Sequence, residues 1–91
     1  MVKVEDTISA ENTFSDAAEV VGPFNFSLSG TWSATVHLQR RFGSDGSWMD
    51  VESFTANAEK RGYEPEGDVY YRFGVKSGNY TSGDVAGRIS Q

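Results

Sequence analysis

Hydrophobic and polar residues alternate with a period of two along much of the chain, which predicts β-strands with one buried face. Segment 31–42 shows this pattern most clearly. Its more apolar face carries Trp32, Ala34, Val36, Leu38, Arg40 and Phe42. The opposite face carries Thr, Ser, His, Gln and Arg side chains. We interpret this segment as the first arm of a long hairpin, Gly30 to Thr55, around which the rest of the fold is organised.

The turn of this hairpin is predicted at residues 43–47, because glycine, serine and aspartate favour turns. The return arm, residues 48–55, alternates less regularly. Met49 and Val51 share one face, and Trp48 and Phe54 share the other. A regular strand cannot bury all four side chains. We expect a β-bulge, which inserts one extra residue into a strand; without a bulge, one aromatic side chain would be exposed.

Other segments carry further strand patterns. Segments 24–29, 68–76 and 84–90 alternate strongly, and segment 57–66 has the charges of an edge strand that Pro65 ends. Segment 13–21 favours a strand over a helix, because it is too short for a stable isolated helix. The glycine, serine and asparagine residues of segment 77–83 predict a turn.

About seven short strands, spaced by roughly eight to twelve residues, are typical of an all-β domain. We therefore expect a single antiparallel β-sandwich of about seven strands, immunoglobulin-like in architecture. A small open β-barrel is the alternative. The sandwich is expected to span residues 13–91, and residues 1–12 are expected to form an N-terminal arm or an edge strand.

Composition adds constraints on stability and partners. The chain has 91 residues, no cysteine and a formal net charge of −5. A domain of this size buries a modest core and cannot gain stability from disulfides, so oligomerisation is the expected additional source. The acidic charge argues against a nucleic-acid partner, which needs a basic face, and against a polybasic membrane contact. The N-terminus lacks the apolar run of a secretory signal peptide, so we expect synthesis in the cytoplasm.

The sequence gives little support for a catalytic function. His37 is the one histidine of the chain, and we expect it on the polar face of its strand. Paired carboxylates near loops can bind calcium or act as acid and base. The candidates are Asp45, Asp50, Glu52, Glu64, Glu66 and Asp68. Their spacing matches no calcium-binding loop, and solvated loop charges are the simpler interpretation. We predict a protein that is not an enzyme, with no catalytic residue, no metal site and no cofactor.

Arginine and aromatic side chains are enriched at the centres of protein interfaces. The predicted interface residues are Trp48, Tyr70, Arg72, Tyr80 and Arg40. Arg40 lies on the apolar face of its strand, so it would reach past the edge of the core or pair with a carboxylate such as Glu52. A carbohydrate-binding surface is the alternative use of the aromatic residues. Its candidates are Trp48, Tyr63, Tyr70 and Tyr80.

Two short stretches resemble known structural motifs. Residues 44–48, Ser-Asp-Gly-Ser-Trp, resemble a shortened Asp-box, the hairpin motif of sialidases and many β-rich proteins. This resemblance implies that Asp45 and Gly46 shape the turn and that Trp48 packs under it. Residues 66–73, Glu-Gly-Asp-Val-Tyr-Tyr-Arg-Phe, look like the penultimate strand of immunoglobulin-like and fibronectin-like sandwiches. There Tyr71 matches the tyrosine-corner position.

The whole chain is similar in pattern to short virion-associated proteins of tailed bacteriophages. The matching stretches are Phe24 to Trp32, Val36 to Arg40, Trp48 to Thr55 and Tyr80 to Val85. The resemblance implies a structural protein of the virion, such as a capsid decoration or cement protein, or a small head–tail or tail component. It also implies a homo-oligomer whose partner is the major capsid protein or another virion protein. A carbohydrate- or surface-binding module is the alternative function.

Overall fold

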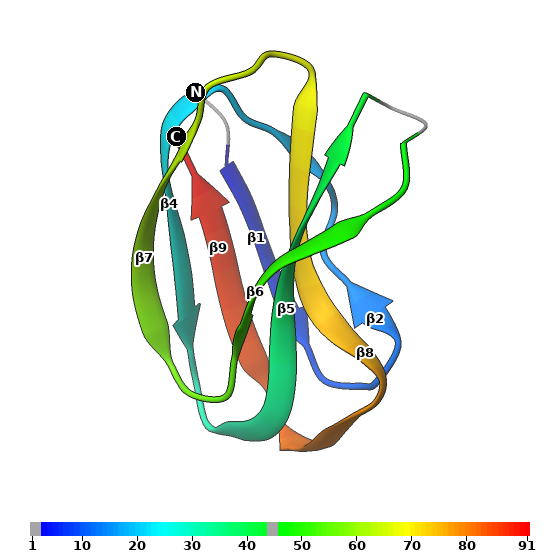
Figure 1. Ribbon diagram of the computed structural model, residues 1–91. Coiled ribbons are helices and arrows are strands. Elements are labelled where there is room, and N and C mark those ends of the chain that lie inside the picture. Colours follow the sequence, from blue (N-terminus) through cyan, green and yellow to red (C-terminus); the bar gives the residue numbers. More distant parts are fainter. Residues whose placement is uncertain (1–2, 44–45) are drawn as a thin grey trace.

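The computed structural model describes residues 3–43 and 46–91, which form nine antiparallel strands in two sheets (Figure 1). Sheet A has the strand order β1-β9-β4-β7, and sheet B has the order β2-β8-β5-β6, with β3 also paired to β8. The strands are β1 (Lys3–Ile8), β2 (Thr13–Phe14), β3 (Ala18–Glu19), β4 (Gly22–Ser29), β5 (Trp32–Phe42), β6 (Met49–Phe54), β7 (Ala58–Glu64), β8 (Val69–Gly83) and β9 (Val85–Ser90). All but β2 and β3 have six or more residues, so the predicted number of about seven full strands is confirmed.

The two sheets pack face to face around one hydrophobic core, which confirms the predicted β-sandwich. Inward-facing residues recur at every second position, as in Phe24, Phe26 and Leu28 on β4. The ring of Phe26 contacts sheet B through Phe54 and Phe73, with centroids 5.3 and 5.7 Å away. Such tilted aromatic pairs add to the stabilisation from burial itself.

The order of the strands differs from that of an immunoglobulin constant domain. There the last two strands belong to one sheet. Here β8 lies in sheet B, and β9 lies in sheet A between β1 and β4. The chain changes sheets at Gly83, which has a φ of +88° and lies so close to the backbone of Thr31 that a Cβ would collide with it. Glycine therefore permits this short crossover.

The N-terminal segment contributes β1 as an edge strand of sheet A, so the sandwich includes residues before position 13. β1 pairs with β9 along its whole length, from Lys3 opposite Ser90 to Ile8 opposite Val85. The side chain of Ile8 is part of the core. Met1 and Val2 lie outside the described residues.

The predicted hairpin is formed by β5 and β6, and β5 lies between β6 and β8 in sheet B (Figure 1). The expected bulge is present: Leu38 pairs with Glu52 and Gln39 pairs with Asp50, which leaves Val51 unpaired. Beyond the bulge, Phe54 is buried with 9% of its surface exposed. The irregular return arm thus buries this aromatic residue and leaves aliphatic side chains outside.

The prediction of a turn at residues 77–83 is wrong, because this segment belongs to β8. The register between β5 and β8 shifts here, from Val36 opposite Val75 to Ala34 opposite Tyr80. Extra residues of β8 lie between these two pairs, and Gly78 among them has a φ of +84°. Glycine, serine and asparagine suit both turns and bulges, so composition alone did not separate the two.

Candidate binding surface on the outer face of sheet B

Three of the five predicted interface residues lie together on the outer face of sheet B. They are Trp48, Tyr70 and Arg72, and Arg41, which the sequence did not single out, joins them. Arg41 on β5 lies opposite Tyr70 on β8, so both side chains point to the same side of the sheet. We call these four residues the arginine–aromatic cluster.

The ring of Trp48 contacts two guanidinium groups. The Cζ atom of Arg41 lies 4.6 Å from the ring centroid, and the Cζ atom of Arg72 lies 4.4 Å from it. Arg72 also lies 3.9 Å from the ring of Phe14, and Arg41 lies 5.2 Å from the ring of Tyr70. Each exposed cation–π contact contributes about 0.5–1 kcal/mol. Each arginine is therefore held by two aromatic rings.

Phe14 can contact Arg72 because the residue opposite it on β8 is a glycine. β2 pairs with β8 so that Phe14 lies opposite Gly74. A Cβ at Gly74 would collide with the ring of Phe14 and the backbone of Thr13. The hydroxyl of Ser15 accepts a hydrogen bond of 3.1 Å from the backbone N–H of Phe73, which fixes the chain just after β2.

A chain of polar contacts orients Arg72 from the other side. Its Nε donates to Oε1 of Gln39 at 2.8 Å, and Nε2 of Gln39 donates to Oδ1 of Asp50 at 3.0 Å. The ammonium of Lys76 pairs with Oδ2 of Asp50. The hydrogen bonds from Lys76 and Gln39 lower the pKa of Asp50 below its usual value.

The cluster concentrates positive charge. Burial lowers the pKa of Arg72, and the nearby charge of Arg41 lowers it further. Among residues 3–43 and 46–91, the basic groups in ion pairs are those of Lys3, Arg40, Lys60 and Lys76. Arg41 and Arg72 thus have no carboxylate partner in the described part of the chain. Asp45, which with Ser44 carries the predicted Asp-box turn, lies outside the described residues.

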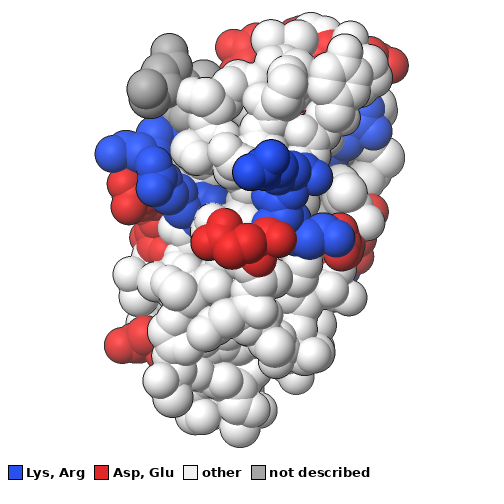
Figure 2. Space-filling view, turned by 90° about the vertical axis from the view of Figure 1, so that its left-hand side faces the viewer, with Lys and Arg blue, Asp and Glu red and all other residues white. Residues whose placement is uncertain are grey.

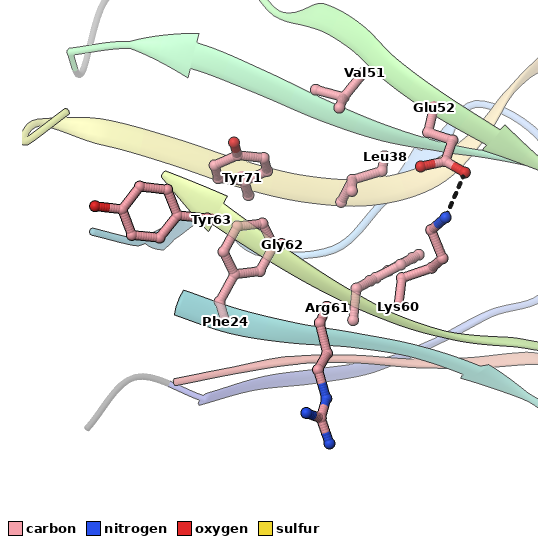
Figure 3. A pocket seen from close by; sticks show the side chains of 10 residues that line it. Phe24, Leu38, Val51, Glu52, Lys60, Arg61, Gly62, Tyr63 and Tyr71 are labelled. Atoms are coloured by element: carbon pink, nitrogen blue, oxygen red, sulfur yellow. Dashed lines mark ion pairs between the residues drawn. The ribbon is translucent and has the colours of Figure 1, made fainter. Parts of the chain in front are cut away.

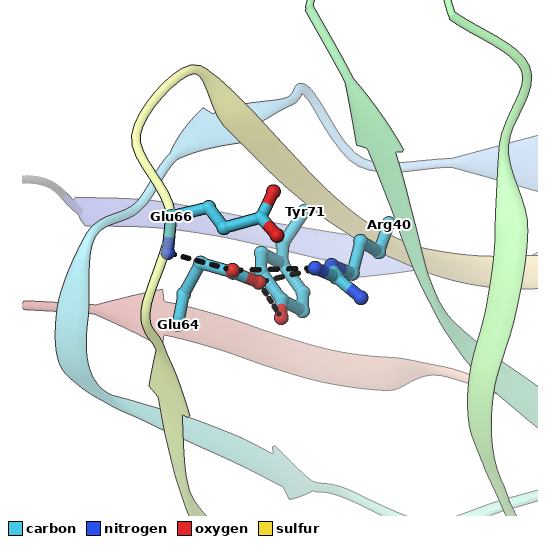
Figure 4. Close-up of polar contacts among 4 residues, drawn as sticks. All are labelled: Arg40, Glu64, Glu66 and Tyr71. Atoms are coloured by element: carbon cyan, nitrogen blue, oxygen red, sulfur yellow. Dashed lines mark hydrogen bonds and ion pairs between the residues drawn. The ribbon is translucent and has the colours of Figure 1, made fainter.

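The other two predicted interface residues lie elsewhere. Tyr80 packs partly buried against the core, and its hydroxyl donates to the carbonyl of Gly83 at 2.8 Å. Arg40 points between the sheets, where its Nη2 donates to Oε2 of Glu64 at 3.2 Å and its Nε lies 2.9 Å from Oε1 (Figure 4). The expectation of a carboxylate partner for Arg40 is confirmed, but the choice of Glu52 was wrong. Cross-sheet neighbours cannot be read from local alternation.

Glu64 is the centre of a buried polar network rather than a solvated loop charge, with 1% of its surface exposed. Besides Arg40, its carboxylate accepts the hydroxyl of Tyr71 at 2.8 Å and the backbone N–H of Glu66 at 3.1 Å (Figure 4). Burial, the hydrogen bond to Glu64 and its charge raise the pKa of Tyr71 to about 12. Tyr71 therefore bonds to a side chain, whereas a tyrosine-corner hydroxyl bonds to the backbone.

A small cavity lies at the side of the sandwich where β6 and β7 are the edge strands. It has a volume of about 150 Å³, and its apolar walls include Phe24, Leu38 and Tyr71 (Figure 3). At its rim, Glu52 on β6 pairs with Lys60 on β7 at 3.3 Å. This exposed ion pair links the two sheets.

At the end of the molecule opposite the arginine–aromatic cluster, three segments contain no charged side chain. We call these segments the uncharged end; they are residues 29–35, 55–58 and 77–83, which are Ser, Thr, Asn, Gly, Ala, Trp and Tyr. Two acidic residues border them: Glu11 accepts the backbone N–H of Gly78 at 2.8 Å, and the backbone N–H of Asp84 donates to the carbonyl of Thr31 at 3.2 Å. Figure 2 shows charged side chains across the middle and top of one flank and a mostly uncharged lower part. Asn57 joins two of these segments, since it accepts the indole N–H of Trp32 at 2.7 Å and donates to the carbonyl of Gly30 at 3.0 Å.

An open groove at the uncharged end is lined by hydroxyl and amide groups together with one indole. Its lining includes Trp32, Ser33, Thr35, Thr55, Asn79 and Thr81. Groups of this kind can hydrogen-bond to a neutral polar ligand but supply no ionic attraction.

Within residues 3–43 and 46–91, no cluster of three or more histidine and carboxylate side chains is placed to hold a metal ion. The same residues include no helix with the length and apolar character needed to cross a membrane. Comparisons with protein-family models, curated proteins and solved structures find no match to this chain.

Proposed function

We propose that this protein is a non-enzymatic structural protein of a phage virion that decorates or cements the capsid through protein–protein contacts. Its partner is the major capsid protein or another virion protein, and it acts as a homo-oligomer in the virion. The similarity in pattern to small virion proteins supports the choice of particle. The arginine–aromatic cluster supports the mode of action.

One observation carries the proposal: Trp48 and Tyr70 lie with Arg41 and Arg72 on one sheet face. Tryptophan, tyrosine and arginine are the residue types most enriched among interface hot spots. Arg41 on β5 and Tyr70 and Arg72 on β8 lie on paired strands, which hold side chains more rigidly than loops do, so less side-chain entropy is lost on binding. A small sandwich with such a face is well suited to attach to a larger assembly.

Capsids that lack the protein provide the test. Purified protein should bind to these capsids and raise their resistance to heat. Trp48→Ala should weaken binding by tenfold or more, as expected for a hot spot of about 2 kcal/mol. Tyr63→Ala is the matched control, because Tyr63 lies on β7 of the other sheet with 68% of its surface exposed. Equal heat resistance with and without the protein, together with no capsid affinity, would rule the proposal out.

The second candidate function is a carbohydrate- or surface-binding module. The groove at the uncharged end favours it, since an indole beside hydroxyl and amide groups suits a neutral sugar. A glycan array distinguishes the two functions. Binding that Asn79→Ala weakens and Trp48→Ala leaves unchanged would locate sugars at this groove, and binding that Trp48→Ala abolishes would locate them at the cluster. An array without any bound glycan would reject this candidate.

A further inference from the structure

The two arginines of the cluster have hydrogen-bonding capacity that the described chain does not use. Arg72 engages its Nε with Gln39, but its terminal nitrogens donate to no described residue. The terminal nitrogens of Arg41 likewise make no hydrogen bond there, and its Nε is buried without a partner among these residues. A guanidinium group has five N–H donors, so several donors in a small area remain available.

The aromatic contacts of the two arginines do not occupy these hydrogen-bond donors. A ring contacts the flat face of a guanidinium group, whereas the N–H bonds lie in its plane and point to its edges. Both guanidinium carbons lie over the ring of Trp48, Phe14 adds to the contact with Arg72, and Tyr70 adds to that with Arg41. The guanidinium groups of both arginines are therefore restrained before any ligand binds, which lowers the entropy lost on binding.

Electrostatics also favours an anion at this position. Both guanidinium groups contact the ring of Trp48, and the charge of Arg41 lowers the pKa of Arg72. Carboxylates bound beside these groups would offset the repulsion and form charge-assisted hydrogen bonds, which are about twice as strong as neutral ones. Asp50 does not fill this role, because it contacts Lys76 and Gln39.

We propose that Arg41 and Arg72, held by Trp48, form a carboxylate-binding site that recognises an acidic segment of a partner protein. This inference names the chemistry of the partner and rests on the proposed function. The net charge of −5 opposes long polyanions such as DNA. A short acidic segment carries few negative charges and can place them at the two arginines alone, away from the acidic remainder of the surface.

The test uses the full chain and a synthetic peptide of alternating glutamate and glycine, with a glutamine–glycine peptide as the uncharged control. Calorimetry should detect binding of the acidic peptide alone, weakening as salt rises. Arg41→Gln and Arg72→Gln should each reduce affinity by tenfold or more. Arg72→Lys should also weaken binding, because lysine keeps the charge but loses the planar fork. Arg88→Gln, which removes an exposed arginine from β9 in the other sheet, should leave affinity unchanged.

Several outcomes would overturn the inference. One is equal affinity of the wild type and the Arg41 and Arg72 variants, with folding of each verified by circular dichroism. Another is duplex DNA binding that depends on these arginines in the absence of peptide binding. A third is peptide binding that is absent in the wild type and arises only in Asp45→Asn, since Asp45 would then occupy the site. Self-association that depends on Arg72, without peptide binding, would identify a second copy as the partner instead.

Peptide binding is measured without capsids, so this inference and the proposed function can fail separately. Protein that binds the acidic peptide but not capsids would contradict the proposed function. Protein that binds capsids equally well with glutamine at positions 41 and 72 would contradict the carboxylate site.

Discussion

Tyr71 on β8 donates its hydroxyl to the buried carboxylate of Glu64 on β7, and this bond of 2.8 Å joins the two sheets inside the sandwich. Arg40 on β5 supplies the opposite charge to the same carboxylate. A buried carboxylate is costly unless it is paired and hydrogen-bonded, and Glu64 meets both conditions. The network therefore fixes how sheet A lies on sheet B.

Removing one partner of the buried ion pair should be far more harmful than removing both. Arg40→Met is expected to cost about 3–5 kcal/mol of unfolding free energy, because Glu64 stays buried without its cation. Combining Arg40→Met with Glu64→Leu should recover much of this loss. Urea unfolding of the two single variants and the double variant measures the coupling. Lys60→Met, which breaks the exposed pair with Glu52, should cost at most about 1 kcal/mol, and additive losses in the double variant would contradict the prediction.

The stability should fall in alkali as Tyr71 is forced to ionise. Its folded-state pKa of about 12 lies above the ordinary value of 10.0, so the folded state holds this proton more tightly. The corresponding stabilisation is complete below pH 10 and is lost as the pH rises through 12. Tyrosinate absorbance should show a step near pH 12 that Tyr71→Phe removes. A titration of Tyr71→Phe identical to that of the wild type would show that another tyrosine accounts for the step.

The bulge in β6 should divide neighbouring apolar residues into essential and dispensable ones. Phe54→Ala is expected to cost about 3–5 kcal/mol, because it leaves a cavity beside Phe26. Val51→Ala should change the unfolding free energy by less than about 0.5 kcal/mol, since Val51 is 49% exposed and unpaired. Denaturant unfolding compares the two variants. Equal costs would mean that the register of β6 differs from the one described.

Gly74 should be intolerant of even one added methyl group. The Cβ of Gly74→Ala would collide with Phe14 and Thr13, so β2 would have to move away from β8. We expect a loss of about 1–3 kcal/mol and weaker protection of the Ser15 amide against hydrogen exchange. Gly67→Ala is the matched control, because no atom lies within 4 Å of the added Cβ. A wild-type exchange rate at Ser15 in Gly74→Ala would argue against the described position of β2.

Most of the sandwich could be predicted because its strands bury one face and so alternate in sequence. The same rule predicted the bulge in β6, where Phe54 and Met49 compete for one interior. It could not identify Glu64 as the partner of Arg40, because that contact joins strands of different sheets. It also missed the extension of β8, where bulged residues interrupt the alternation.

The candidate surface was predicted in part. Residue type pointed to Trp48, Tyr70 and Arg72, since tryptophan, tyrosine and arginine favour interfaces. Arg41 was missed because polar strand faces usually carry solvated arginines. Strand alternation could have identified Arg41. It directly follows the inward-facing Arg40, so its side chain lies on the same strand face as Gln39. Tyr80 also belongs to a residue type that favours interfaces, but it lies at the far end of β8 from Tyr70 and Arg72. No local sequence pattern reveals this separation.

The scarcity of charge at the uncharged end has a consequence for how a complex would respond to its surroundings. Nine residue steps along β5, about 30 Å, separate Arg41 from Trp32. Salt weakens ionic contacts by screening, but it has little effect on contacts between neutral groups. A particle held through both ends of this molecule would therefore have one attachment that a salt wash loosens and one that it leaves in place.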